Sequence, residues 1–311
     1  MCIYGNDFGK GVKGSGIDHQ NSSIIVDYLI IMMEREKRYL IPFCDTYKNL
    51  PSTLKESWRR TICLWSFRVV DHFSLPRETV AMSMSHYDRF LWYLCNTCSE
   101  PISSECVSLI SLTTLFLSTK LQRRSHVSIE MFSELSAFRY SVHDIALMET
   151  KIISALEWRL NPPTHECFVG LLLEMIPISQ MTKKALFQAA CYNTQTSICD
   201  KYLSKLAVST VAVASILAAT ECINVTALPL HFIHTFMSNV ATFLGIDCNS
   251  PEIDTARKRV VKNDRDSQIK STDSRIGHTC KSPHQFYRHL NHETTCNLNI
   301  FMSTSQSNVT I

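Results

Sequence analysis

The sequence predicts an all-α protein built from two consecutive helical bundles, with one helix before them and a disordered C-terminal tail after them. Successive segments place apolar residues three and four positions apart, which is the period of an amphipathic helix. Two further segments, residues 107–117 and 206–220, are apolar or small on nearly all sides. A helix that is apolar all round must be surrounded by others, so each segment indicates the centre of one bundle.

The first half of the chain divides into three parts. Residues 1–21 hold five of the eight glycines and are expected to be flexible. Residues 22–50 hold a helix, ended by Pro42, and a linker. Residues 51–160 form the first bundle, whose last helix begins at Ser141 with Asp144 three positions on, the spacing of a capping box.

The second half repeats the theme over residues 161–248. Thr164 is placed to cap the first helix of this part, and Gly245 is a natural C-cap for the last. Residues 249–311 are poor in apolar side chains, so we expect a disordered tail. This tail contains a basic run, Arg257–Lys262, that is a candidate nuclear import signal. It also contains two candidate phosphorylation sites that precede proline, Ser250 and Ser282.

Charge and cysteine usage narrow the function classes. The tail carries nine Lys/Arg against six Asp/Glu, while the other 248 residues carry 22 of each, which disfavours direct nucleic-acid binding by the bundles. Thirteen cysteines, an odd number, are spread through apolar runs, as expected of intracellular thiols. Cys95 and Cys98 have metal-ligand spacing but no matching second pair, so we expect no metal and no cofactor. The longest apolar run is too short to span a membrane.

Glu149 is the most informative single residue, because it falls within the apolar stripe of the helix that begins after Ser141. A buried and unpaired carboxylate would cost several kcal/mol, so a cation should lie nearby. Lys120 is the best candidate, since it is an isolated cation at the end of an apolar helix. From the pattern alone this pair is either an internal ion pair that fixes helix register or a polar site for a partner.

Four motifs, in order and spacing, resemble those of the cyclin family across most of residues 22–245. The first motif, WRRTICLW, looks like the first helix of the cyclin box, which bears an arginine and a tryptophan. The third motif, LFLSTKLQ, looks like the lysine-bearing third helix. The second motif, LPRETVAMSMSHYDRFL, looks like the second helix of the cyclin box. The fourth motif, METKIISALEWRLNPPT, looks like its glutamate-bearing fifth helix. In chain order the motifs read WRRTICLW, LPRETVAMSMSHYDRFL, LFLSTKLQ and METKIISALEWRLNPPT.

This resemblance implies two five-helix cyclin folds and a regulatory subunit that is not itself an enzyme. It implies that Lys120 and Glu149 bind the backbone beside the regulatory helix of a cyclin-dependent kinase, and that the complex controls cell-cycle progression. Substrates or inhibitors of the complex are further expected partners. The expected localisation is the nucleus and the cytoplasm.

The first helix departs from the family pattern. An aspartate usually precedes the tryptophan, where this chain has Leu64, and an acidic residue usually follows three positions after it, where this chain has Arg68. A cationic Arg68 would repel a ligand that carries arginine. The stripe formed by Trp58, Ile62 and Trp65 is therefore either a docking groove or, as we favour, part of the core.

Two other function classes stay open on the sequence. A cyclin-fold factor or scaffold resembling transcription factor IIB, which does not bind a kinase, would have a strongly basic body and usually a zinc ribbon. A thiol enzyme that uses Cys95 and Cys98 would need a sequence context that is missing here.

Overall fold

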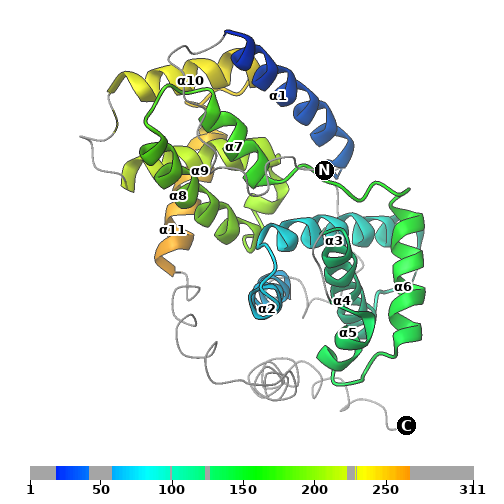
Figure 1. The fold of residues 1–311 in the computed structure, drawn as a ribbon. Helices are drawn as coiled ribbons and strands as arrows, with labels where there is room; N and C mark the ends of the chain where they lie inside the picture. Colours follow the sequence, from blue (N-terminus) through cyan, green and yellow to red (C-terminus); the bar gives the residue numbers. More distant parts are fainter. Residues whose placement is uncertain are drawn as a thin grey trace.

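The computed structural model describes residues 19–41, 58–98, 100–122, 127–222, 228 and 230–266, and the chain is helical without strands over these ranges (Figure 1). The all-α prediction is confirmed. The helices form two bundles, with α1 (His19–Tyr39) lying against the second (Figure 1).

The first bundle is arranged around α4, which is buried at every position from residue 110 to residue 119. The hydroxyls in this stretch are tolerated because they donate to carbonyls of the preceding turn, as Thr113 does to Leu109 over 2.8 Å. Over the described residues the bundle comprises α2 (Trp58–His72), α3 (Glu78–Thr97), α4 (Ser104–Lys120), α5 (Ile129–Leu135) and α6 (Val142–Ala155).

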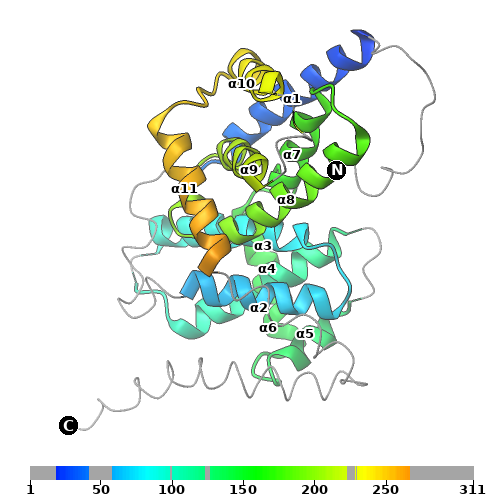
Figure 2. The same ribbon diagram turned by 90° about the vertical axis from the view of Figure 1, so that its left-hand side faces the viewer.

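The second bundle is arranged in the same way around α9, whose residues 209–219 are all buried. α7, α8 and α11 pack against this central helix (Figure 2). The elements of the bundle are α7 (His165–Glu174), α8 (Gln180–Ile198), the short 3-10 helix η2 (Leu203–Lys205), α9 (Val208–Cys222), α10 (Leu230–Leu244) and α11 (Pro251–Asp266).

α11 corrects the expected start of the tail. We expected a disordered tail over residues 249–311, whereas residues 251–266 form the fifth α-helix of the second bundle. Three small or apolar side chains, Ile253, Ala256 and Val260, are buried on this helix at spacings of three and four. So sparse a stripe is hard to recognise in a charged segment. Residues 267–311, including Ser282, lie outside the described residues, as do 1–18 and 42–57.

α1 is fixed to the second bundle by a buried carboxylate. Glu36 is 4 % exposed and accepts hydrogen bonds from the backbone N–H of Ser209 (2.8 Å) and from its hydroxyl (2.7 Å). Glu36 therefore caps the N-terminus of α9 from a helix 173 residues earlier in the chain, where the helix dipole favours a negative charge. Burial raises the pKa of Glu36, so part of this gain is offset by desolvation.

Polar residues of α2 and α3 hold the two bundles together. Arg59 forms an ion pair with Asp88 and donates through Nε to the carbonyl of Ile198, at the end of α8, over 3.2 Å. Glu78 accepts a hydrogen bond from the hydroxyl of Thr164, which is the N-cap of α7. The motif residues Arg59, Glu78 and Asp88 thus serve the junction between the bundles.

His86 on α3 ties together parts of the first bundle. It is fully buried; its Nε2 lies 2.8 Å from the carbonyl oxygen of Leu160 and its Nδ1 lies 3.0 Å from the Ser118 hydroxyl. Because a carbonyl only accepts, the ring carries its proton on Nε2 and is neutral. Burial lowers the pKa of His86 to about 4.

Candidate functional site

Lys120 is positioned by the burial of the helix that precedes it. α4 runs through the first bundle and emerges at its last residue, where a cation is favourable for the helix dipole. The Lys120 ammonium also lies 5.2 Å from the centroid of the Phe116 ring, one turn earlier. The last residue of α4, Lys120, therefore places a cation at the rim of the apolar core of the first bundle.

Glu149 is positioned by a well-capped helix. The capping box of Ser141 and Asp144 expected from the sequence is present at the start of α6. Ile145, Met148 and Ile152 are the buried residues of α6. Glu149 lies beside them, at the edge of the apolar face rather than at its centre.

The two charged groups meet at the surface of the first bundle. Lys120 Nζ lies 2.7 Å from Glu149 Oε1, and the side chains are 48 % and 12 % exposed, respectively. The ion pair expected from the sequence is thus formed. Because the lysine is half exposed to water, the pair contributes about 0–1 kcal/mol to stability, which is too little to explain it as a device for folding alone.

Apolar side chains share the helix face on which Glu149 lies. Val142 is exposed and Ile153 is half-buried, and both share a face with Glu149 by their spacing of seven and four residues. Beyond the end of α6, Trp158 is 76 % exposed. The two residues at this turn, Glu157 and Trp158, have φ angles of 52° and 60°, which non-glycine residues adopt rarely.

Trp158 was not selected from the sequence. The sequence signal that could have indicated Trp158 as a site residue is its position in a polar turn before two prolines. A tryptophan outside the apolar stripe of a helix is not placed to pack in the core. An exposed tryptophan in a strained backbone conformation is a feature of binding sites more than of packing.

The stripe of α2 has a different role. Trp58 and Ile62 are buried, and the half-buried Trp65 packs on the core of the first bundle. The core alternative therefore fits the geometry, and these three side chains do not line an open docking groove.

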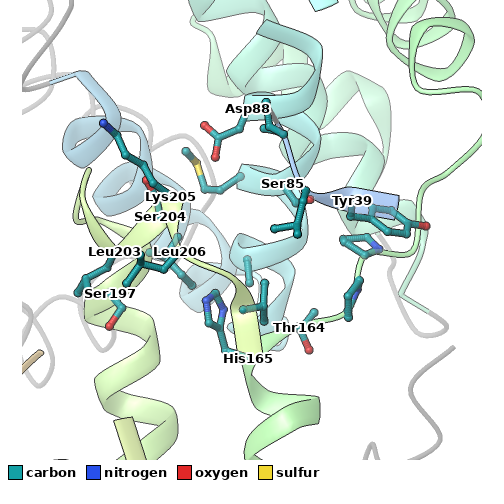
Figure 3. A pocket seen from close by; sticks show the side chains of 18 of the residues that line it. Tyr39, Ser85, Asp88, Thr164, His165, Ser197, Leu203, Ser204, Lys205 and Leu206 are labelled. Atoms are coloured by element: carbon teal, nitrogen blue, oxygen red, sulfur yellow. The ribbon is translucent and has the colours of Figure 1, made fainter. Parts of the chain in front are cut away.

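A cavity of about 140 Å³ lies at the junction of α1, α3, η2 and the linker before α7 (Figure 3). Tyr39, Ser85, Thr164 and His165 are among its lining residues. Burial lowers the pKa of His165 to about 4. The cavity is separate from the Lys120–Glu149 pair, whose residues do not line it.

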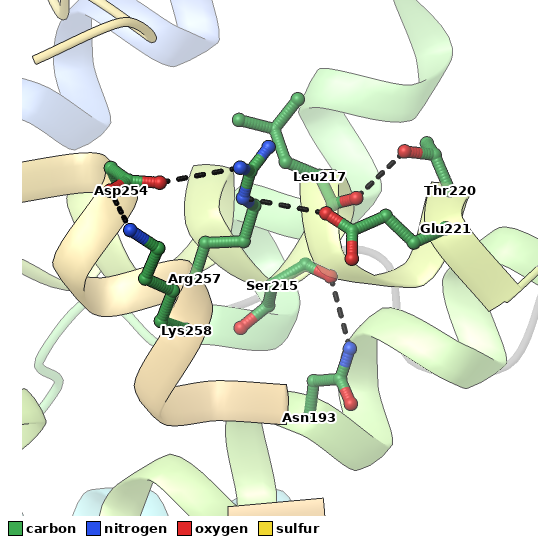
Figure 4. A network of polar contacts seen from close by, with 8 residues as sticks. All are labelled: Asn193, Ser215, Leu217, Thr220, Glu221, Asp254, Arg257 and Lys258. Carbon is green, nitrogen blue, oxygen red and sulfur yellow. Dashed lines mark hydrogen bonds and ion pairs between the residues drawn. The ribbon is translucent and has the colours of Figure 1, made fainter. Parts of the chain in front are cut away.

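The basic run Arg257–Lys262 is part of a folded helix. Figure 4 shows Arg257 between Glu221 of α9 (3.4 Å) and Asp254 (3.3 Å), and Lys258 paired with Asp254 (2.6 Å). Val260, within the run, is fully buried. The run is thus engaged in the second bundle.

Ser250, the described candidate phosphosite, is the residue before α11. Its hydroxyl oxygen accepts the backbone N–H of Ile253 over 3.3 Å, and Glu252 and Asp254 follow in the first turn. A phosphate at Ser250 would lie beside these two carboxylates.

The remaining expectations concern absences. Among the residues that the structure describes, no three His, Cys, Asp or Glu side chains gather to hold a metal ion. No described helix is long and apolar enough to cross a membrane. Cys95 is half-buried and Cys98 is exposed, and neither forms a disulfide.

The fold and the candidate site together define a class of protein: a tandem helical-bundle protein with an ion pair at the rim of its first core. The family described as "Cyclin, N-terminal domain" matches residues 25–161. Residues 25–161 of the chain are therefore similar to the N-terminal domain of cyclins.

Curated relatives agree with this assignment. Cyclin-A3-3 of Arabidopsis thaliana is 26 % identical over 201 residues, which are 63 % of this chain and 58 % of the relative. G1/S-specific cyclin-D1 of Xenopus laevis is 21 % identical over 211 residues, which are 67 % of this chain and 70 % of the relative. The match to Cyclin-A1-2 of Arabidopsis thaliana, 23 % identical, spans 57 % of this chain and 39 % of that relative.

A solved structure shares the fold. The viral cyclin from herpesvirus saimiri superposes with a TM-score of 0.60 at 17 % identity, over 77 % of this chain and 97 % of the viral protein. The cyclin fold predicted from the motifs is therefore confirmed.

Proposed function

We propose that this chain binds and activates a cyclin-dependent serine/threonine kinase, and that it does so through the Lys120–Glu149 pair. The observation that carries the proposal is the pair itself, an ion pair of 2.7 Å at the rim of the first core. Lys120 donates one hydrogen bond in this pair, and an ammonium group has three donors. The pair therefore retains capacity to bond the backbone of a partner.

The surroundings support docking of an apolar partner surface. Val142 and Ile153 lie on the same face of α6 as Glu149, and the exposed Trp158 lies just beyond the end of this helix. When a partner covers such a site, the ion pair loses its water and its hydrogen bonds to the partner gain strength. Buried aromatic residues and desolvated charges are the usual hot spots of protein interfaces.

The activation step follows from the family resemblance. A cyclin contributes binding energy to one of two states of its kinase, in which the regulatory helix lies inward and the catalytic Lys–Glu ion pair is formed. The chain would do no chemistry itself. Its effect on the kinase is limited to the difference between its affinities for the two states.

The test has two stages. The tagged chain is used to recover its kinase from dividing cells of its own source, with identification by mass spectrometry. The dissociation constant of the purified pair is then measured by calorimetry, together with histone phosphorylation. The Lys120→Ala/Glu149→Ala variant should weaken binding by about 2–5 kcal/mol, or roughly 30-fold to several thousand-fold.

A matched control is available on the second bundle. Lys258 and Asp254 form a comparable exposed pair at 2.6 Å on α11, so Lys258→Ala/Asp254→Ala should leave kinase binding unchanged. Recovery of the kinase in equal amounts by the Lys120/Glu149 variant and the wild type would refute the assignment of the site. Recovery of no kinase by either chain would refute the proposed function.

Localisation to the nucleus and the cytoplasm belongs to the same proposal. A cell-cycle kinase acts in both compartments, and Arg257–Lys262 would have to leave helix α11 to act as an extended import signal. Imaging of the fluorescently tagged chain, with Lys258→Ala as a comparison, tests both statements.

A further inference from the structure

Two thiols from different bundles meet at the junction. Cys63 of α2 is fully buried, and its Sγ lies 3.5 Å from the carbonyl oxygen of Ile198, the residue that precedes Cys199. Cys199 is the C-cap of α8 and is also buried. The Cys199 thiol donates to the carbonyl of Gln195 over 3.9 Å, and both cysteines pack in the same core. The two thiols influence each other's ionisation, and neither forms a disulfide.

The two thiols differ in electrostatic environment. Burial raises the pKa of Cys63, whereas the neighbouring Cys63 thiol lowers the pKa of Cys199. Arg59 and Arg60 favour the thiolate of Cys199, while Asp200 opposes it, and Asp88 opposes the thiolate of Cys63. Arg59 is held in place by its bond to the Ile198 carbonyl. One thiol is thus the better nucleophile, and the other is placed to react with its product.

A cavity lies beside this place, although neither cysteine lines it. The cavity at the bundle junction is lined by Arg59, Ser197 and Ile198, which are the residues next to the two thiols. Its volume of about 140 Å³ exceeds that of a few water molecules, so a molecule of the size of hydrogen peroxide fits.

We propose that Cys63 and Cys199 form an oxidisable dithiol, which a peroxide converts into a disulfide that links the two bundles. The juxtaposition of the two sulfurs across the junction carries this inference. It does not depend on the proposed kinase partner.

The reaction balances with one peroxide molecule. The Cys199 thiolate attacks a peroxide oxygen; an S–O bond forms, the O–O bond breaks, and the leaving hydroxide takes a proton to become water. The Cys63 thiol then attacks the sulfenic sulfur of Cys199; an S–S bond forms and the S–O bond breaks to release a second water molecule. The two cysteines lose two electrons and two protons in total, and a thiol such as glutathione reverses the step.

The link would join residues 136 positions apart, Cys63 on α2 of the first bundle and Cys199 at the end of α8 of the second, where both side chains pack in the first core. A cross-link of this length restricts the unfolded chain strongly, so the oxidised protein should resist separation of its bundles. The consequence is a cyclin-fold protein whose interdomain geometry is fixed under oxidising conditions.

The experiment uses the full-length chain. The protein is treated with graded hydrogen peroxide, alkylated with N-ethylmaleimide, digested with trypsin and mapped by tandem mass spectrometry. We expect peptide 61–68 linked to peptide 185–201 with the loss of two hydrogens, and near-complete loss of alkylation at both cysteines. Treatment with dithiothreitol should restore both thiols.

Cys191 is an internal control, because it is buried on the same tryptic peptide as Cys199 and burial raises its pKa. Fragment ions should place the link at Cys199 and leave Cys191 reduced. In the Cys63→Ala variant, Cys199 should be trapped by dimedone as a sulfenic acid. In the Cys199→Ala variant, Cys63 should stay reduced.

Circular dichroism checks that both variants fold, and the wild-type peptide map decides the question alone if one of them does not. The proposal is overturned if the Cys63–Cys199 link is missing at a peroxide concentration that fully oxidises the exposed Cys98. It is also overturned if the link appears only in urea, or if Cys199 pairs with Cys191.

Discussion

Replacement of Glu36 tests whether one carboxylate fixes α1 to the second bundle. Glu36 accepts two hydrogen bonds from Ser209 at the N-terminus of α9, and hydrogen bonds to a charged group contribute about 1.5–3 kcal/mol each. Desolvation of the carboxylate, which raises its pKa, offsets part of this sum. For Glu36→Ala we therefore expect a loss of about 2–3 kcal/mol in the free energy of unfolding. Glu36→Gln keeps one acceptor and should lose about half as much.

Two probes separate the bundles in this assay. All four tryptophans lie between residues 58 and 158, so fluorescence reports the first bundle, whereas circular dichroism reports every helix. Urea denaturation of Glu36→Ala should lower the midpoint by about 1 M in the helical signal, given a typical slope of about 2 kcal/mol per molar urea. The shift in fluorescence should be smaller.

Glu34 provides the matched control, since it lies two residues earlier on α1 and pairs only with Lys37, at the surface. Glu34→Ala should change the free energy of unfolding by less than about 0.5 kcal/mol. If Glu36→Ala came within 0.5 kcal/mol of Glu34→Ala, the capping role of Glu36 would be wrong.

Three further predictions concern the core of the first bundle, the buried His86 and the last helix of the second bundle. Leu115 is fully buried on α4, so Leu115→Ala should cost about 2–5 kcal/mol in urea denaturation followed by fluorescence, while Leu147→Ala on the exposed side of α6 should cost little. His86 has a folded pKa of about 4 and takes up its proton near 6.5 when unfolded, so its contribution to stability is full above pH 6.5 and is lost as the pH falls toward 4. Between pH 7.5 and 5.5 the wild type should therefore lose about 1 kcal/mol more than His86→Gln, and equal losses would contradict the buried neutral ring. A chain that ends at residue 249 lacks α11 and should melt at a lower temperature than one that ends at residue 266; equal melting would show that α11 is dispensable.

Local signals determined much of this protein from the sequence alone. Helix starts followed from side chains that cap their own backbone, as at Ser141 and Thr164. The two central helices followed from apolar residues on every side. Even the Lys120–Glu149 pair followed from local pattern. A lone charge at the edge of an apolar helix face requires an opposite charge nearby, and the helices that carry Lys120 and Glu149 each have one such lone charge.

Tertiary structure decided the features that depend on contacts between distant residues. Glu36 reads as an ordinary surface charge in a run of charged residues, and only the packing of α1 brings it to the N-terminus of α9. Helix α11 reads as tail because three small apolar residues suffice once α9 presents a complementary surface. The core role of the Trp58 stripe and the meeting of Cys63 with Cys199 likewise depend on how the helices and bundles pack, since the residue types are compatible with other arrangements. Periodicity fixes which face of a helix is apolar, whereas the element that covers that face is fixed by the long-range packing of the whole chain.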